Sequence, residues 1–176
     1  NWQTAMHNNG QIFKWGAGTF NLSVASPLYT TALTVNGGTF RLSGFGTIAG
    51  TAAITVRSGS VLELDNSVTN VNSRLSTRPL TLTASRFNYI GNGAATSSET
   101  LGILTAGAGG NTVSVSGGTG GSEATLTFAS LASNMVNVGG FLNLQGIDAN
   151  NRVIFTTAPT LVGGVIQRAP GAHLGR

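Results

Sequence analysis

The chain has 176 residues, of which 40% are hydrophobic and only 8% are charged. Because disordered segments are poor in apolar residues and rich in net charge, this composition excludes intrinsic disorder. The formal net charge is +4, but no dense basic stripe occurs, so we expect no nucleic-acid partner. Without cysteine, the chain has neither a disulfide framework nor a thiolate metal site. No apolar run has the length of a membrane span, and we expect none in this segment.

The same composition predicts an all-β fold with many turns. The sequence contains 26 Gly, 23 Thr, 16 Ser and 16 Asn, whereas lysine occurs once and glutamate three times. Threonine and the β-branched aliphatic residues favour strands. Glycine and asparagine favour the left-handed corners between short strands.

A short strand motif recurs along the first half of the chain, with apolar residues at every second position. Its first apolar residue is Phe20, then Phe40, then Leu62 and then Leu80, so the copies follow one another at similar intervals. The four copies are Gly18-Thr19-Phe20-Asn21-Leu22, Gly38-Thr39-Phe40-Arg41-Leu42, Ser60-Val61-Leu62-Glu63-Leu64 and Pro79-Leu80-Thr81-Leu82.

A second strand type shares this period. It reads Ala32-Leu33-Thr34-Val35 and then Ala53-Ile54-Thr55-Val56. Two strand types with one period are typical of a solenoid, in which each turn of the chain buries its apolar face on its neighbours. Because short turns rather than helices join the strands, the pattern predicts a single-stranded parallel β-helix with roughly 20–22 residues per turn.

The alternation within each strand points one face inward and the other into water. We therefore expect Phe20, Leu33, Phe40, Ile54 and Leu62 to be buried in adjacent turns. The shared period further predicts that Phe20, Phe40 and Leu62 form one column.

A stack of this kind leaves a row of unpaired backbone groups at each end. We expect the region around Ile12–Trp15 or around Val153–Phe155 to be covered. The cover would be a capping segment, more of the same chain or another copy of it.

More strands are predicted in the second half of the chain, where the period is looser. No shift in composition marks a domain boundary, so residues 1–176 are expected to form one solenoid segment of a longer chain. Residues 158–176 are expected to form a terminal coil or a linker. The predicted strands are Leu80–Ala84, Phe87–Ile90, Leu101–Leu104, Thr112–Ser116, Ala124–Phe128, Phe141–Leu144 and Val153–Phe155.

Five stretches carry a family resemblance: Leu80-Thr81-Leu82-Thr83, Phe87-Asn88-Tyr89-Ile90-Gly91, Ser98-Glu99-Thr100-Leu101-Gly102-Ile103-Leu104, Gly107-Ala108-Gly109-Gly110-Asn111-Thr112-Val113 and Ala124-Thr125-Leu126-Thr127-Phe128. Together they resemble autotransporter-associated β-strand repeat proteins, large repetitive surface or secreted proteins of the planctomycete type. The resemblance covers roughly residues 16–146. It implies a right-handed β-helix, an extracellular or cell-surface location and a structural or adhesive role. It carries no catalytic residues.

The sharpest candidate for catalysis is the pair Glu63 and Asp65. Two residues apart on one strand, their carboxylates project from one outer face at a separation near that of glycosidase acid pairs. The competing interpretation is two solvated, ionised acids beside Arg41 or Arg57. Only five acids and two histidines occur in the chain, so acid–base chemistry has few candidates. We expect no enzymatic activity.

No cofactor or metal ion is expected either. The glycine runs complete neither a dinucleotide fingerprint nor a phosphate-binding loop. His7 and His173 have no partner at metal-binding spacing.

Uncharged Thr, Ser and Asn faces offer lateral contacts, so we expect other copies of the same protein as partners, and glycans as candidate partners. Two alternative functions remain, a β-helical polysaccharide lyase or hydrolase and a segment of a trimeric phage tail fibre. For the four central arginines two interpretations compete, which are simple exposure on a solvated face and binding of an acidic glycan. The candidate contacts to glycans or partners are Arg57, Arg74, Arg78, Arg86 and Tyr89.

Overall fold

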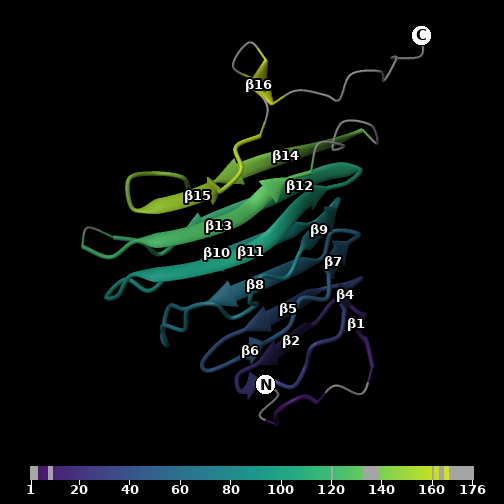
Figure 1. Ribbon diagram of the computed structural model, residues 1–176. Coiled ribbons are helices and arrows are strands. Elements are labelled where there is room, and N and C mark those ends of the chain that lie inside the picture. Colours follow the sequence, from purple (N-terminus) through teal and green to yellow (C-terminus); the bar gives the residue numbers. More distant parts are fainter. Residues whose placement is uncertain are drawn as a thin grey trace.

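The computed structural model describes residues 4–7, 10–119, 121–132, 139–159, 161–162 and 165–166. All regular structure in these residues is β-strand, which confirms the predicted all-β class. A seven-stranded sheet and a six-stranded sheet dominate, with two small two-stranded sheets beside them. Figure 1 shows the strands of the large sheets stacked one above another from the N-terminal end upward.

The seven-stranded sheet contains, in spatial order, β1 (Ile12–Lys14), β4 (Leu33–Val35), β7 (Ile54–Arg57), β9 (Leu80–Thr83), β11 (Ser97–Ala106), β13 (Ala124–Leu131) and β15 (Asn151–Phe155). The six-stranded sheet contains β2 (Thr19–Leu22), β5 (Thr39–Leu42), β8 (Val61–Asp65), β10 (Arg86–Ile90), β12 (Gly109–Ser116) and β14 (Gly140–Gln145). The small sheets are β3 (Ala25–Ser26) with β6 (Thr47–Ile48), which is parallel, and β16 (Leu161–Val162) with β17 (Val165–Ile166), which is antiparallel.

Apart from the short strands β3 and β6, which follow β2 and β5, the chain alternates between the two large sheets from β1 to β15. We call a strand of the seven-stranded sheet and the next strand of the six-stranded sheet a unit. Neighbouring strands in both sheets are parallel and come from successive units. Backbone hydrogen bonds therefore run from unit to unit along the stack. All seven strands predicted in the second half are present, and β11, β12 and β13 extend furthest beyond their predicted bounds.

The core lies between the inner faces of the two large sheets. The predicted column is confirmed, because Phe20 pairs with Phe40 and Phe40 pairs with Leu62. Leu33, Phe40, Ile54 and Leu62 are completely buried. Phe20 is only partly buried, because β2 is the edge strand of its sheet, although its ring stacks on that of Phe40 with 5.2 Å between centroids.

The predicted position of Leu80 is wrong. It was expected to follow Leu62 in the same strand type. Instead Leu80 pairs with Ile54 in the seven-stranded sheet, and Phe87 takes the place beside Leu62. Both of these pairs are further apart in the chain than the pairs between the first units. The predicted length of a turn therefore holds only for the first units. A loop of residues 66–79, which we call the inserted loop, lengthens the turn after β8, and later partners such as Val113 and Leu144 are also further apart than predicted.

The corner that leads from the seven-stranded into the six-stranded sheet repeats a left-handed residue. Gly38, Gly59 and Gly109 have φ values of 62°, 74° and 81° there, and Ala84 takes the same place with a φ of 46°. At Gly38 a Cβ atom would lie 2.3 Å from the carbonyl oxygen of Gly18 in the preceding unit. Glycine is therefore required here for close stacking as well as for its backbone angle.

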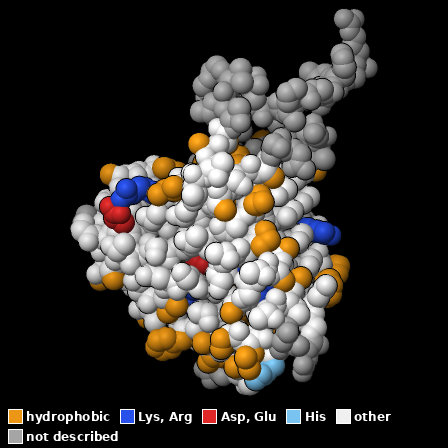
Figure 2. Space-filling view, viewed as in Figure 1, with side chains coloured by type: hydrophobic (Ala, Val, Ile, Leu, Met, Phe, Trp, Pro, Cys, Tyr) orange, Lys and Arg blue, Asp and Glu red, His pale blue; other side chains and the backbone are white. Residues whose placement is uncertain are grey.

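At the N-terminal end, β1 and β2 are the outermost strands of their sheets, and among the described residues no strand pairs with their outer edges. Met6 packs against the core, and its backbone N–H donates to Ser26 Oγ at 2.8 Å. Covering of the remaining edges stays a prediction. Exposed apolar side chains include Phe13, Leu28 and Phe45, and Figure 2 shows hydrophobic side chains gathered towards this end.

The tail predicted as a terminal coil or linker, residues 158–176, falls largely outside the described residues. Within it, β16 and β17 form their short antiparallel pair.

Candidate functional site

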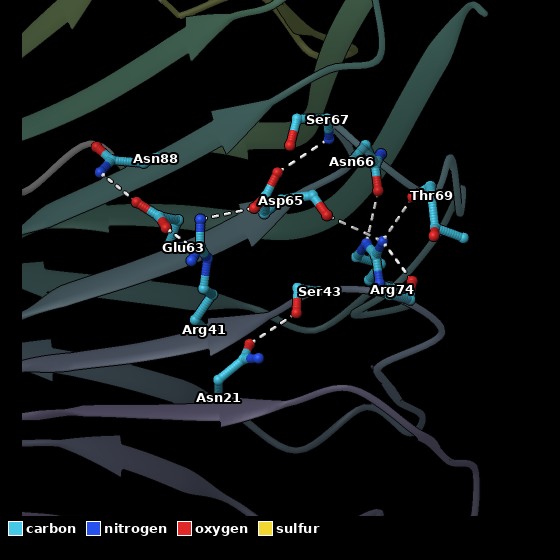
Figure 3. Close-up of polar contacts among 11 residues, drawn as sticks. Asn21, Arg41, Ser43, Glu63, Asp65, Asn66, Ser67, Thr69, Arg74 and Asn88 are labelled. Carbon is cyan, nitrogen blue, oxygen red and sulfur yellow. Dashed lines mark hydrogen bonds and ion pairs between the residues drawn. The ribbon is translucent and has the colours of Figure 1, made fainter. Parts of the chain in front are cut away.

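A ladder of polar side chains crosses the outer face of the six-stranded sheet (Figure 3). Arg41, Glu63, Asn88 and Ser114 occupy the same register position on β5, β8, β10 and β12. Asn88 Nδ2 donates to Glu63 Oε2 at 3.2 Å, and Ser114 Oγ donates to Asn88 Oδ1 at 2.8 Å. In-register parallel strands bring equivalent side chains to within about 5 Å of one another. Outward polar side chains at one register position can therefore form hydrogen bonds from each unit to the next.

Arg41 binds both carboxylates of the candidate catalytic pair. Its Nε lies 2.9 Å from Glu63 Oε1, and its Nη2 donates to Asp65 Oδ2 at 2.6 Å. The predicted pairing with Arg41 is confirmed. The expectation that both acids are well solvated is wrong, because their side chains are only 18% and 12% exposed beneath the arginine.

This geometry does not suit a general acid, which must hold its proton near neutral pH. Burial alone would raise the pKa of Asp65. Hydrogen bonds from Ser67 and the charges of Arg41 and Arg74 outweigh it and hold that pKa below its ordinary value. Asp65 is therefore an ionised partner of Arg41.

Arg74 is completely buried, although arginine is among the residues least often found inside proteins. It comes from the inserted loop, and its guanidinium reaches the carbonyl oxygens of Gly44 and Gly46, which precede β6. Figure 3 shows the guanidinium next to Asn66 and Thr69. Its Nε, Nη1 and Nη2 all donate hydrogen bonds, so the charged group is fully solvated by the protein. The acceptors, at 2.6–3.1 Å, are Asn66 Oδ1 and the carbonyl oxygens of Gly44, Gly46, Asp65 and Thr69.

Arg78 lies later in the same loop. Its side chain is also completely buried, and its guanidinium also donates to backbone carbonyl oxygens. The guanidinium lies over the ring of Tyr29, 5.7 Å from the centroid. Its acceptors are the carbonyl oxygens of Tyr29, Thr31, Ala49 and Ala52.

These positions correct three of the five predicted surface contacts. Arg74, Arg78 and Tyr89 have no exposed surface, so they lie neither on a solvated face nor within reach of a glycan. The two guanidinium groups donate to buried loop and corner carbonyls, which need donors, and the Tyr89 hydroxyl accepts from Asn66 Nδ2. Arg57 and Arg86 are exposed, as expected, and their role in binding stays a prediction.

Glu99 is a buried carboxylate that sequence reasoning missed. It faces inward from β11 with 1% of its surface exposed. Its Oε2 accepts from the backbone N–H of Arg74 at 2.7 Å, and its Oε1 accepts from that of Leu75 at 3.0 Å. The alternation that ends at Leu101 would have revealed it if extended back to Ser97. Glu99 thus fixes the loop that carries both buried arginines.

We expect the stability contribution of Glu99 to fall as pH rises. Burial raises the pKa of Glu99 from 4.5 to about 7, although the two N–H donors and the charge of Arg74 oppose the rise. Between these values the folded state binds more protons than the unfolded state, so stability declines with increasing pH, by about 3 kcal/mol at most. Urea unfolding of wild type and of Glu99→Gln from pH 4.5 to 8 measures this effect.

The slope of stability against pH is the quantity to compare, because Gln leaves one backbone N–H without an acceptor and lowers stability at every pH. The wild type should lose stability over this range more steeply than the variant. Parallel profiles would show that Glu99 is ionised throughout.

Other chemistry is limited in the described part of the chain. No group of three or more His, Cys, Asp or Glu residues gathers there as metal ligands would. No helix in these residues has the length and apolarity needed to cross a membrane.

No family model, curated protein or solved structure shows a significant match to this chain.

Proposed function

We propose that this chain is a single-stranded right-handed parallel β-helix that serves as an extracellular structural or adhesive segment, like those of autotransporter-associated repeat proteins. The observation that carries the proposal is the strict alternation of strands between two parallel sheets that share one continuous core. Parallel connections of this kind are right-handed in nearly all proteins, which supports the handedness.

The proposed role is mechanical. Backbone hydrogen bonds join each unit to the next along the stack, so a load along the stack is shared among many parallel bonds. On the seven-stranded sheet, a row of uncharged threonines runs from unit to unit and consists of Thr34, Thr55, Thr81 and Thr105. A face of this kind suits lateral contact with other copies or with glycans.

The absence of enzymatic activity is part of this proposal. Each of the five acids in the chain has a structural partner. Arg41 holds Glu63 and Asp65, backbone N–H groups hold Glu99, and Arg152 pairs with Glu123. The fifth acid, Asp148, accepts hydrogen bonds from Asn150 and Asn151 in its own turn.

We expect the purified chain to associate with itself as its concentration rises. Among the described residues no further strand pairs with the terminal strands of the two large sheets, and terminal strands of this kind template further pairing. Sedimentation velocity over a wide concentration range, with electron microscopy of the associated species, measures this. End-to-end or lateral assemblies support the proposal, and a closed trimer favours the tail-fibre alternative. A strict monomer at high concentration contradicts the predicted assembly.

The enzyme alternative is tested on the same preparation. Release of reducing or unsaturated ends from acidic and neutral polysaccharides is expected to match the buffer control. Turnover that falls a hundredfold in Glu63→Gln and Asp65→Asn, the usual scale of acid–base catalysis, would overturn the structural proposal.

A further inference from the structure

A shallow groove lies on the outer face of the six-stranded sheet, next to the glycine corner. Val61, Arg86 and Thr112 stand side by side on β8, β10 and β12 and line it. Gly59 and Gly110 line it at the corner, and at Gly59 no atom lies within 4 Å of the place that a Cβ atom would take. The groove measures about 170 Å³, less than the roughly 300 Å³ of a small drug site. It has room for one unit of a longer ligand.

Arg86 gives the groove a cation without a carboxylate partner. It is exposed, and no acid lies within ion-pair distance of it among the described residues, which include all five acids of the chain. The nearest acid in register, Glu63, is two residues beyond the partner of Arg86 on β8 and is held by Arg41. The guanidinium is therefore available to an anionic ligand, for which its planar donor fork is suited.

An exposed aromatic ring lies next to the groove, over one of the two glycines that line it. Phe141 on β14 is 64% exposed and pairs with Gly110. Its ring lies directly over that glycine, because a Cβ atom on Gly110 would be 2.9 Å from Phe141 Cζ. An aromatic face of this kind packs on the C–H face of a sugar ring, whereas a free inorganic anion would gain nothing from it.

We propose that the groove binds one anionic unit of an extracellular glycan, with Arg86 on its carboxylate or sulfate group and Phe141 against its ring. The inference rests on the adhesive role proposed above and specifies its ligand class. Of the five residues predicted to contact glycans or partners, the inference keeps Arg86 as the glycan contact, and it adds Phe141.

The test is calorimetric titration with four probes: a galacturonate tetrasaccharide, a sulfated chondroitin tetrasaccharide, neutral xylotetraose and inorganic sulfate. We expect one or both acidic glycans to bind at least tenfold more tightly than xylotetraose. Arg86→Gln should weaken that binding about tenfold, since a charge-assisted bond is lost, and Phe141→Ala should weaken it several-fold. Preference between the two acidic probes identifies the anionic group.

Arg57→Gln is the matched control, because it removes the same charge from an exposed position on the other large sheet, where Arg57 pairs with Thr83. It should change affinity less than twofold. An equal loss of affinity in Arg57→Gln would show that binding depends on diffuse electrostatic attraction. That result would overturn the proposal that the groove is the binding site. Sulfate binding as tightly as the glycans, with Phe141→Ala unaffected, would reduce the site to an anion site and also overturn the inference.

Failure here is distinguishable from failure of the proposed function. Absence of binding by all four probes overturns the groove, while self-association is measured independently. Both substituted side chains are exposed, so an unchanged thermal midpoint in each variant confirms that loss of binding is not loss of fold.

Discussion

Replacing Arg74 by methionine is expected to lower the free energy of unfolding by about 3–5 kcal/mol. Methionine fills part of the volume but donates no hydrogen bond, so Asn66 Oδ1 and four carbonyl oxygens lose their shared donor. Each buried acceptor left without a partner costs about 1–3 kcal/mol, offset in part because the buried charge is removed as well. Urea denaturation followed by far-ultraviolet circular dichroism measures the change.

Arg57→Met is the control for this experiment. Arg57 is exposed and has no acidic partner among the described residues, so its replacement should shift stability by only about 0.5 kcal/mol. Arg74→Lys should fall between the two, because an ammonium group keeps the charge but has at most three donors. Similar losses in Arg57→Met and Arg74→Met would contradict the structural role of Arg74.

The second large effect is expected at Phe40, whose replacement by alanine should cost about 3–5 kcal/mol. The ring is completely buried, is stacked on Phe20 and lies in register with Leu62, so its removal opens a cavity that touches two neighbouring units. Phe45→Ala makes the same chemical change on a side chain that is 69% exposed. We expect it to cost less than about 1 kcal/mol in the same assay, and an equal loss at both positions would argue against the packed column.

The all-β class and the first core column could be predicted because the information for both is local. Apolar residues at every second position place Phe20, Phe40 and Leu62 on the inner face, and a nearly constant step places them in one column. Leu80 was misplaced because both strand types have an apolar residue at every second position, so that Leu80-Thr81-Leu82 fits either type. Only pairing distinguishes them, and the inserted loop changed the step between pairs.

The buried charges could not be predicted in the same way. A lone arginine in a polar loop is usually exposed, and nothing near Arg74 in the sequence shows that carbonyl groups of Gly44 and Gly46 converge on it. Those groups belong to a corner 28–30 residues earlier. Glu99 is different, because the alternation at Leu101 would place it inward if the predicted strand were extended back to Ser97. Carboxylates are usually exposed, but at Glu99 the strand alternation predicts burial and is correct.

The inserted loop also affects how the stack can come apart. In an array where each unit contacts only its neighbours, units unfold one at a time from the ends. Arg78 bonds to carbonyls of Ala49 and Ala52 and, one unit further back, to those of Thr31 and Tyr29, 47 and 49 residues away in the chain. Separating either unit from the stack would leave a buried guanidinium short of acceptors. The N-terminal units are thereby joined into a single cooperative block, whose amide protons should exchange with solvent together rather than in order from the terminus.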